Sequence, residues 1–300
     1  MGSDILLEAG TGELEILEFL IGKRIYAINV IKVKEVIDVK EENITKLPNA
    51  HAAIAGLLLV RGEIIPLIDL KFVLENQHKS ENRFRVIVCE FNKVKVAFYI
   101  DDIVGVHRIK WDQILKPEDL TANSLVIGNI IFNEKIILML DFEKIVTDIN
   151  PNSGINENKI VDVTYKDRSG AKLVMADDSP LIRRLITETL TKAGFNSIKM
   201  FDDGKQALNY IEDILDKKGE KFIEDVQILI TDIEMPQMDG FTLTRKIKEH
   251  EVMRKLPVII FSSLITDELK HKGESLGVDA QLSKPEIGEL VDLIDTLLAK

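Results

Sequence analysis

Residues 172–180 read KLVMADDSP, and this stretch decides how the second half of the chain folds. The apolar run LVMA is typical of a short buried strand. The Ser-Pro pair that closes the stretch is typical of a helix start, with a Ser cap and Pro in the first helical position. Between them stand two adjacent carboxylates, Asp177 and Asp178, which repel each other and lose solvation at a buried strand end. Such a pair predicts a functional role.

Around this stretch, apolar runs alternate with amphipathic segments. We expect strands at 172–177, 197–201, 226–231, 257–262 and 280–284, and helices at 179–194, 204–218, 240–252, 266–276 and 286–299. The last helix has apolar residues at the i, i+3, i+4, i+7 spacing of one face, namely Ile287, Leu290, Val291, Ile294, Leu297 and Leu298. Five βα units predict an open parallel sheet with right-handed crossovers.

Polar residues follow several of these strands, and ligands of such sheets bind beyond the carboxyl ends of the strands. The residues are Asp177, Asp178, Asp232, Ser262, Ser263 and Lys284. Each alone has an ordinary structural use, since an Asp after a strand is often a helix cap. Three acids at one rim, however, repel one another unless a hard cation lies among them, and an oxygen-only ligand set favours Mg²⁺. A lysine and a hydroxyl beside the cation can stabilise a phosphoryl group.

Four motifs in the order VMADDSPLIRRLI, ILITDIEMPQMDGF, VIIFSS and LSKP resemble those of response-regulator receiver domains, over about residues 171–300. The resemblance implies an α/β flavodoxin-like (βα)5 fold with the parallel strand order 2-1-3-4-5, an order known for CheY. It also implies that Asp232 is the phosphoacceptor, that Ser262 is the switch hydroxyl and that Lys284 contacts the phosphoryl group. The implied Mg²⁺ ligands are Asp177, Asp178, Asp232 and the backbone carbonyl of Glu234.

The same resemblance predicts different roles for the two adjacent acids. We expect Asp178 to contact Mg²⁺ directly and Asp177 to act largely through water. Without the cation the three acids should weaken the fold, so Mg²⁺ should raise the melting temperature.

Two positions depart from the receiver pattern. Receivers often carry an aromatic switch residue three positions before the lysine, where this chain has Gln281. Signalling by rotation of an aromatic ring is therefore in doubt. Two residues beyond Asp232 stands Glu234, whose carboxylate would lie at the mouth of the site and repel or block incoming water. We therefore expect slow hydrolysis of the aspartyl phosphate.

Residues 13–150 have the composition of strands. Three stretches, 13–37, 83–109 and 124–146, are each interrupted by a turn signal, and each predicts a hairpin. The turn signals are Gly22-Lys23, Asn92-Lys93 and Asn133-Glu134. The segment GEIIPLIDLKFVL (62–74) is similar to NEKIILMLDFEKIV (133–146), which favours two similar small barrels that close their own edges.

The first half contains no catalytic constellation. Its three histidines, His51, His78 and His107, share no ligand spacing, and we expect them at the surface or in loops. The segment AGLLLVRGEIIPLIDL resembles the core of CheW-type coupling domains, whose fold is two small SH3-like barrels. Within it, Arg61 and Gly62 interrupt an apolar run as a turn or as a partner contact. We therefore expect a coupling domain at 13–150, a linker at 151–170 and a receiver at 171–300.

The order of the two domains resembles that of the CheV family of chemotaxis coupling proteins. This implies a non-enzymatic adaptor that joins chemoreceptor tails to the histidine kinase CheA and is modulated by phosphorylation of Asp232. One alternative is a phosphate sink that drains the kinase without signalling. Another is a Mg²⁺-dependent phosphatase of the haloacid-dehalogenase type, although those enzymes use a D-x-D motif and this chain has adjacent acids. A transcriptional regulator would need a basic output domain.

Charge and composition exclude other classes. The net charge of -11 is spread evenly, with -5 in residues 1–150 and -6 in the remainder, which argues against nucleic acid as a partner. A single cysteine, Cys89, excludes an intrachain disulfide and a CxxC metal site. No signal-peptide pattern and no apolar run of membrane-spanning length is present. We expect a cytoplasmic protein without direct membrane insertion, recruited to membrane receptor arrays through its partners.

Overall fold

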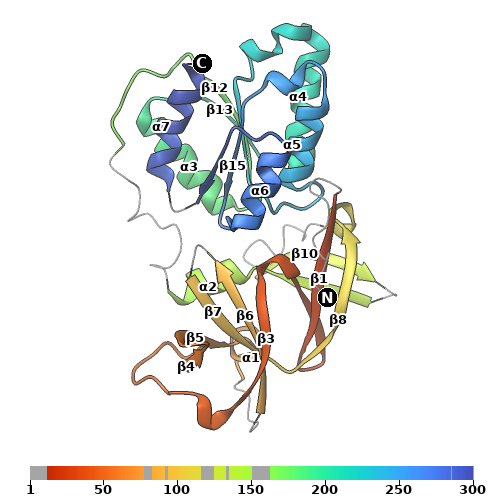
Figure 1. The fold of residues 1–300 in the computed structure, drawn as a ribbon, viewed down its shortest axis with the longest axis vertical. Helices are drawn as coiled ribbons and strands as arrows, with labels where there is room; N and C mark the ends of the chain where they lie inside the picture. Colours follow the sequence, from red (N-terminus) through yellow and green to blue (C-terminus); the bar gives the residue numbers. More distant parts are fainter. Residues whose placement is uncertain are drawn as a thin grey trace. The chain divides into compact units, whose positions relative to one another are not determined.

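The computed structural model describes residues 12–77, 83–91, 94–115, 125–132, 135–150, 163–284 and 286–299. The chain divides into two compact units, of which the first comprises Leu14–Gly154 and the second contains Ile155–Lys300. The first unit is built of strands with short helices, whereas strands and helices alternate in the second (Figure 1). The predicted order of an all-β half followed by an α/β half is confirmed.

One sheet of the first unit has the strand order β8-β1-β2-β11-β10-β9. Its strands are β1 (Glu13–Ile21), β2 (Arg24–Asn29), β8 (Asp102–Lys110), β9 (Ile114–Leu115), β10 (Val126–Phe132) and β11 (Lys135–Leu140). β1 and β2 pair antiparallel on either side of Gly22, which confirms the predicted hairpin. Ile109 of one edge strand and Ile114 of the other belong to the same apolar cluster, so the sheet curls around its own core like a barrel.

The other sheet of the first unit has the strand order β3-β6-β7-β5-β4. Its strands are β3 (Val33–Lys40), β4 (Ile54–Val60), β5 (Glu63–Asp69), β6 (Arg83–Phe91) and β7 (Val94–Ile100). Its edge strands also meet in one apolar cluster, to which they contribute Val39 and Leu58. The predicted turns at 92–93 and 133–134 lie outside the described residues. The strands beside them, β6 with β7 and β10 with β11, pair antiparallel as expected.

The two sheets exchange strands, which the hairpin prediction missed. After β2, the side chain of Asn29 accepts a hydrogen bond from the amide of Ile31 at 3.2 Å and starts the short 3-10 helix η1 (Val30–Lys32). The chain then enters β3 of the other sheet, so the stretch 13–37 contributes strands to both sheets. A shared cluster joins the sheets, with Phe98 and Phe142 in edge-to-face contact at 4.7 Å between ring centroids.

The similarity between residues 62–74 and 133–146 reflects a repeated structure. In both places a hairpin whose first strand carries a β-bulge is followed by a short helix. The helices are α1 (Leu70–Glu75) and α2 (Phe142–Ile149). Asp69 accepts a hydrogen bond from the amide of Phe72 at 3.1 Å, and Asp141 accepts one from the amide of Lys144 at 2.9 Å. The Asp that the two segments share is therefore a helix N-cap.

The second unit has a parallel sheet in the order β13-β12-β14-β15-β16, which confirms the predicted order 2-1-3-4-5. The strands are β12 (Lys172–Ala176), β13 (Ser197–Phe201), β14 (Ile228–Thr231), β15 (Val258–Ser262) and β16 (Ala280–Ser283). The helices are α3 (Pro180–Ala193), α4 (Gly204–Lys218), α5 (Gly240–Glu249), α6 (Asp267–Ser275) and α7 (Ile287–Leu298). Every predicted strand and helix of this half is present.

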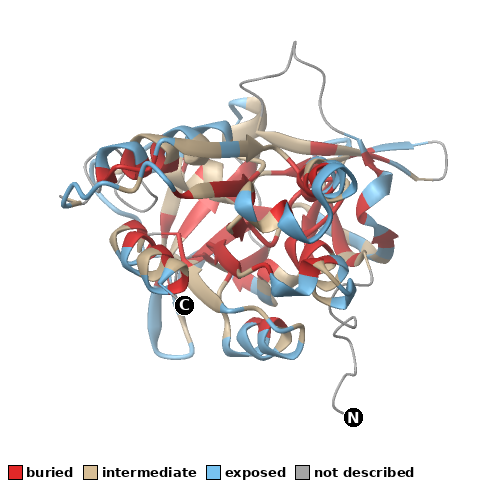
Figure 2. Cartoon of the chain, turned by 90° about the horizontal axis from the view of Figure 1, so that it is seen from above, coloured by how far each residue is buried: buried red, intermediate tan, exposed pale blue. Residues whose placement is uncertain are grey.

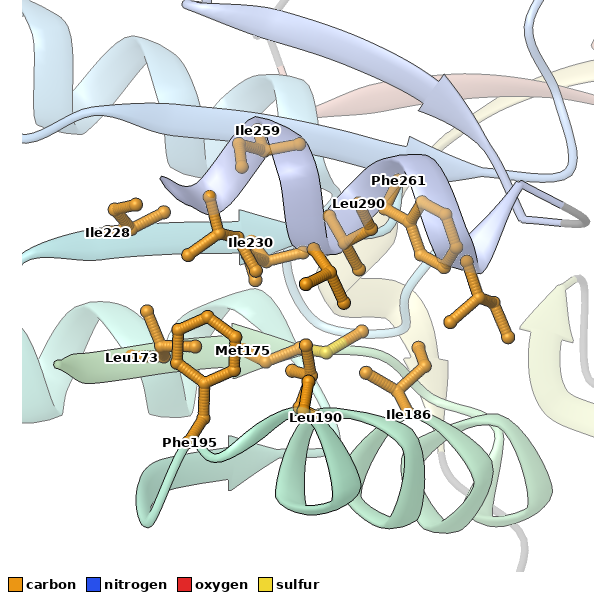
Figure 3. Packing of buried hydrophobic residues seen from close by; sticks show 14 of the residues in the cluster. Leu173, Met175, Ile186, Leu190, Phe195, Ile228, Ile230, Ile259, Phe261 and Leu290 are labelled. Carbon is orange, nitrogen blue, oxygen red and sulfur yellow. The ribbon is translucent and has the colours of Figure 1, made fainter. Parts of the chain in front are cut away.

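Alternation along the strands builds a core on each face of this sheet. In β12, Leu173 and Met175 pack with residues of α3 and α7 (Figure 3), whereas Val174 and Ala176 pack with residues of α4 and α5. Figure 2 shows the buried residues along the strands and the inner faces of the helices. The predicted apolar face of α7 is buried at Ile287, Leu290, Val291, Ile294 and Leu297.

Helix α5 ends earlier than predicted because a histidine ends it. The prediction extended the helix to 252, but the structure ends it at Glu249. The Nδ1 atom of His250 accepts hydrogen bonds from the amides of Val252 at 3.2 Å and Met253 at 3.3 Å. The chain turns there into the 3-10 helix η8 (Met253–Lys255). Periodicity alone does not reveal such a side-chain stop.

The described end of the predicted linker is attached to the second unit. The Arg168 guanidinium forms two hydrogen bonds of 2.7 Å with the Asp295 carboxylate of α7. It also donates to the carbonyl of Ala193 at the end of α3 and lies over the ring of Phe195. Arg168 therefore fixes the point from which the chain enters β12.

Candidate functional site

Asp177 follows β12 and is fully buried. Its Oδ1 atom accepts a hydrogen bond from the amide of Ser179 at 2.9 Å, and its backbone carbonyl accepts one from Arg183 Nη1 at 2.6 Å. The Ser179 hydroxyl accepts a bond from the amide of Ile182 and caps α3, as the sequence predicted. The strand end and the helix start therefore hold the Asp177 carboxylate in one orientation.

Asp232 follows β14, the neighbouring strand, and is buried as well. Its amide donates to the carbonyl of Ala176 at 2.9 Å, and its carbonyl accepts a bond from the Thr231 hydroxyl at 2.9 Å. Its Oδ1 atom accepts a bond from the amide of Ile233 at 2.6 Å. Gly240, the first residue of α5, leaves the space that the Asp232 carbonyl occupies, because a Cβ at 240 would lie 1.9 Å from that oxygen.

The three acids that the sequence predicted at one rim do come together. Asp177, Asp178 and Asp232 each offer a carboxylate oxygen, and these oxygens lie within 4.8 Å of one another. Burial raises the pKa of Asp177 to about 6, while the attraction of Lys284 opposes this rise and the charge of Asp232 adds to it. Burial, more than the neighbouring carboxylate, therefore opposes the ionisation of Asp177.

Lys284 is the buried cation of the cluster. Its Nζ atom lies 2.5 Å from Asp232 Oδ2 and 3.0 Å from Asp177 Oδ2. Apart from this contact with Lys284, the Oδ2 atom of Asp177 has no partner in the described part of the chain. The site therefore has a carboxylate oxygen that can accept a further ligand, beside the buried ammonium group of Lys284.

Ser262 is connected to the cluster through the backbone of Lys284. Ser262 ends β15, is buried, and accepts a hydrogen bond on its carbonyl from the Lys284 amide at 3.1 Å. Its hydroxyl oxygen accepts a bond from the amide of Leu264 at 3.3 Å. The hydroxyl therefore holds the loop that leads into α6.

The remaining predicted site residues lie at the same rim or in the other unit. Glu234 is partly exposed in the loop that follows Asp232. Arg61 and Gly62 form the turn between β4 and β5, with positive φ angles of 50° and 86°. The Arg61 side chain is 80% exposed, and its guanidinium pairs with Glu35 at 2.9 Å. Arg61 and Gly62 therefore belong to a surface of the first unit, whereas the acidic cluster belongs to the second unit.

Sequence reasoning missed an exposed apolar pair on each repeated hairpin. We call these the hairpin pairs. The cross-strand partners Leu59 and Ile64 are 72% and 71% exposed, and the partners Ile131 and Ile136 are 61% and 67% exposed. In each hairpin one further cross-strand pair follows toward the end of the hairpin, Val60 with Glu63 or Phe132 with Lys135. The signal was present in the two similar segments, because the first Ile of EIIPLID corresponds to the first Ile of KIILML.

Comparison with known families assigns both units. The CheW-like domain family matches residues 15–150, and the response regulator receiver domain family matches residues 173–295. The chemotaxis protein CheV3 of Helicobacter pylori is 32% identical over 283 residues, which cover 92% of this chain and 89% of the relative. The chain belongs to the CheV family. It is therefore a CheV-type chemotaxis protein with a coupling domain and a receiver domain.

Two further relatives agree with this assignment. The chemotaxis protein CheV1 of Helicobacter pylori is 27% identical over 293 residues, which cover 91% of this chain and 89% of the relative. The chemotaxis protein CheW of Thermotoga maritima is 29% identical over 148 residues, which cover 48% of this chain and 94% of the relative. Of the helices described, none is both long enough and apolar enough to cross a membrane.

Proposed function

We propose that the receiver domain accepts a phosphoryl group on Asp232, and that this modification adjusts how the coupling domain links chemoreceptor tails to the histidine kinase CheA. The observation that carries the proposal is the buried ion pair between Lys284 and Asp232, whose Nζ and Oδ2 atoms are 2.5 Å apart. A buried lysine beside a carboxylate can contact the oxygens of a phosphoryl group bonded to that carboxylate. Ordinary surface lysines lack this geometry.

The reaction is a transfer from a phosphohistidine of the kinase to a carboxylate oxygen of Asp232. A P–O bond forms as the P–N bond breaks, and the imidazole nitrogen keeps the electron pair of the broken bond. The bonds of Ala176 and Thr231 to the Asp232 backbone hold the acceptor in place before the donor arrives. The receiver thus supplies position and charge, and the kinase supplies the activated phosphate.

The acidic cluster fits Mg²⁺. Its donors are oxygens, and among the described residues the buried Asp177 Oδ2 atom has no partner other than the Lys284 ammonium. Asp177, Asp178, Asp232 and the backbone carbonyl of Glu234 would hold the ion. When bound, Mg²⁺ supplies positive charge that stabilises the phosphoryl oxygens during transfer.

Phosphorylation would add roughly -1.5 to -2 charges at neutral pH beside Lys284. Ser262 is the switch hydroxyl in this proposal. If its hydroxyl turns toward the phosphoryl group, the amide of Leu264 loses its acceptor and the loop before α6 is released. The altered face of β15, β16 and α6 would then change the partner affinity of the coupling domain.

The proposed partner surface of the coupling domain is the β4–β5 hairpin. Arg61 presents an exposed guanidinium at the turn, and Leu59 and Ile64 present exposed apolar surface beside it. Arginine and desolvated apolar groups contribute most to protein interfaces. The partners are proteins of the receptor array, which would recruit this cytoplasmic adaptor to the membrane without its own insertion.

The proposal is tested with Asp232→Asn, which keeps the size of the side chain. The variant should bind CheA and receptor tails as the wild type does, yet it should accept no phosphate from phosphorylated CheA. Phosphate transfer to this variant would refute the acceptor assignment. Kinase activity in reconstituted receptor arrays then separates a switch from a sink, because a mere sink drains phosphate without changing kinase coupling. Turnover of a generic phosphomonoester would support the phosphatase alternative instead.

A further inference from the structure

Helix α6 of the receiver is attached to the sheet by little apolar surface. All nine of its residues are described, and only Leu269 and Gly273 are buried. Each of the other four helices of this unit buries five residues. Since most of the stability of a protein helix comes from packing of its apolar face, apolar packing alone holds α6 more weakly than its neighbours.

Gln281 of β16 provides a polar attachment for this helix. It stands three residues before Lys284, where receivers often carry an aromatic residue, and it pairs with Ile260 of β15. Its Nε2 atom donates a hydrogen bond of 2.8 Å to the backbone carbonyl of Lys270 in α6. The carboxamide of Gln281 therefore connects the edge strand of the sheet to the helix.

Gly273 leaves the space that this carboxamide occupies. A Cβ at position 273 would lie 2.6 Å from the Cδ, Nε2 and Oε1 atoms of Gln281. Glycine is a poor helix former compared with alanine, so its place within α6 requires a reason. The left-handed residue that follows the helix is Gly277, with a φ of 78°, and Gly273 is not needed for that turn. The close approach of Gln281 explains the glycine.

The oxygen of the same carboxamide lacks a partner. Gln281 Oε1 is buried and accepts no hydrogen bond from the described residues. A buried polar atom of this kind is rare in folded proteins and costs free energy. If α6 moved away from β16, water would reach the oxygen and remove this cost. The unpartnered oxygen therefore offsets part of the bond to Lys270 and makes release of the helix easier.

We propose that Gln281 and Gly273 form a clasp that holds α6 on β16 in the unphosphorylated receiver and opens when Asp232 is phosphorylated. In the closed state the carboxamide is bonded to the helix backbone, and in the open state water solvates it. Two such states close in free energy can carry a signal without rotation of an aromatic ring.

The clasp lies close in the sheet to the proposed switch hydroxyl. Ser262 of β15 pairs with Ser283 of β16, two residues beyond Gln281. If the Ser262 hydroxyl turns toward the phosphoryl group, the amide of Leu264 loses its acceptor and the loop before α6 is released. The clasp then holds a helix whose entry loop is free, and its strength decides whether α6 moves. This step rests on the proposed function, whereas the clasp itself does not.

Hydrogen exchange of the α6 amides, in the full chain without Mg²⁺, tests the clasp directly. Gln281→Ala removes the bond to Lys270, so exchange should become about fivefold faster. The matched control is Gln227→Ala, because Gln227 also makes a backbone hydrogen bond of 2.8 Å, which it accepts from the amide of Lys172 at the start of β12. The control should leave α6 exchange unchanged. Unchanged exchange in Gln281→Ala would overturn the clasp.

Gly273→Ala gives a second test, in which the sign of the effect depends on Gln281. In the wild-type chain the added methyl group should displace the carboxamide, so α6 exchange should become faster although alanine favours a helix. In the Gln281→Ala background that space is empty, and the same substitution should slow exchange about fourfold through helix propensity. Slower exchange in both backgrounds would overturn the clasp.

Beryllium fluoride with Mg²⁺, an analogue of the phosphoryl group on an aspartate, tests the signal. It should speed α6 exchange about fivefold in the wild type and much less in Gln281→Ala, whose helix is already loose. An unchanged wild type, or a full response in Gln281→Ala, would overturn the opening of the clasp on phosphorylation. Failure of the proposed function appears separately, as a wild type that takes up no phosphate from CheA, and the exchange measured without Mg²⁺ does not depend on that result.

Discussion

The acidic rim of the receiver consists of buried charged side chains, whereas the hairpin pairs of the coupling domain consist of exposed apolar side chains. On the rim, Asp177, Asp232 and Lys284 are buried charges that pair with one another. On the hairpins, apolar side chains such as Ile64 and Ile136 face solvent. Each reverses the usual distribution of residues between interior and surface. Buried charges suit a small charged ligand, whereas exposed apolar pairs suit the surface of another protein.

The largest expected effect is on phosphoryl transfer, when the lysine of the acidic rim is replaced. Lys284→Met removes the only basic side chain that the structure places in ion-pair contact with the described acidic cluster, so the rate of phosphoryl transfer to Asp232 should fall by about 10²–10³-fold. Single-turnover transfer from phosphorylated CheA measures this rate. CheA binding through the coupling domain should be unaffected.

The control for this variant is Lys246→Met, which changes an exposed lysine of α5. It should transfer phosphate as the wild type does. Since removal of Lys284 leaves buried carboxylates unpaired, the melting curve of Lys284→Met should be recorded with and without Mg²⁺. A transfer rate equal to that of the wild type would contradict the role of Lys284.

The second prediction concerns a substitution on the exposed hairpin surface that leaves the acidic rim unchanged. Ile64→Lys places a charge where the proposed interface is apolar, and the affinity for the partner should fall by about 10–100-fold. Because Ile64 is exposed, the melting temperature should change little. The matched variant Ile136→Lys changes the equivalent position of the other hairpin, and isothermal titration with CheA compares the two. Ile136→Lys should bind CheA as the wild type does, and an Ile64→Lys variant that also binds as the wild type does would show that the β4–β5 hairpin is not the interface.

The comparison also explains which features could be predicted from the sequence. Asp177, Asp232, Ser262 and Lys284 follow strands with clear periodicity, and a parallel sheet brings such strand ends to one edge. Their proximity is thus a consequence of topology, and the cluster of acids follows from it. The sequence periodicity of the second unit is enough to predict this proximity, because each strand–helix–strand connection joins segments that are close in sequence.

The hairpin pairs and the burial of Glu18 in β1 could not be predicted in the same way. Ile64 lies within a continuous apolar run, and nothing in such a run says which residues face outward until the register with β4 is known. Glu18 looks like any charged residue of an edge strand until β8 covers it, and His107, expected at the surface or in a loop, lies within β8. The stretch 13–37 was mistaken for one hairpin because strand exchange between two barrels depends on long-range packing.

The third prediction concerns the pH dependence of stability that the buried Asp177 carboxylate causes. Since the pKa of Asp177 is raised to about 6 from 3.8, its contribution to stability is complete below 3.8 and is lost as the pH rises through 6. In Mg²⁺-free buffer, Asp177→Asn should therefore be more stable than the wild type at pH 8, by about 1–3 kcal/mol, and nearly equal to it at pH 4. Thermal unfolding of the receiver in a chelator measures this difference.

Addition of Mg²⁺ provides the opposing control for the same variant. The ion should raise the melting temperature of the wild type and should raise that of Asp177→Asn much less, because a ligand that binds only the folded state stabilises it. Equal stabilisation of both proteins would contradict the assignment of Asp177 to the metal site. A wild-type melting temperature indifferent to Mg²⁺ would count against the site as a whole.

The smallest expected effect concerns the lifetime of the phosphorylated rim. Glu234 follows Asp232 by two residues and is partly exposed, so its carboxylate would lie where water approaches the aspartyl phosphate. A charge in such a position contributes about 1 kcal/mol, so Glu234→Ala should hydrolyse its phosphate about fivefold faster than the wild type. Glu234→Gln separates the effect of charge from that of size, because its phosphate should be hydrolysed faster only if the negative charge of Glu234 repels water. Decay of radiolabelled phosphate from the purified receiver measures the rates, and an unchanged rate in Glu234→Ala would exclude any protection of the phosphate by this side chain.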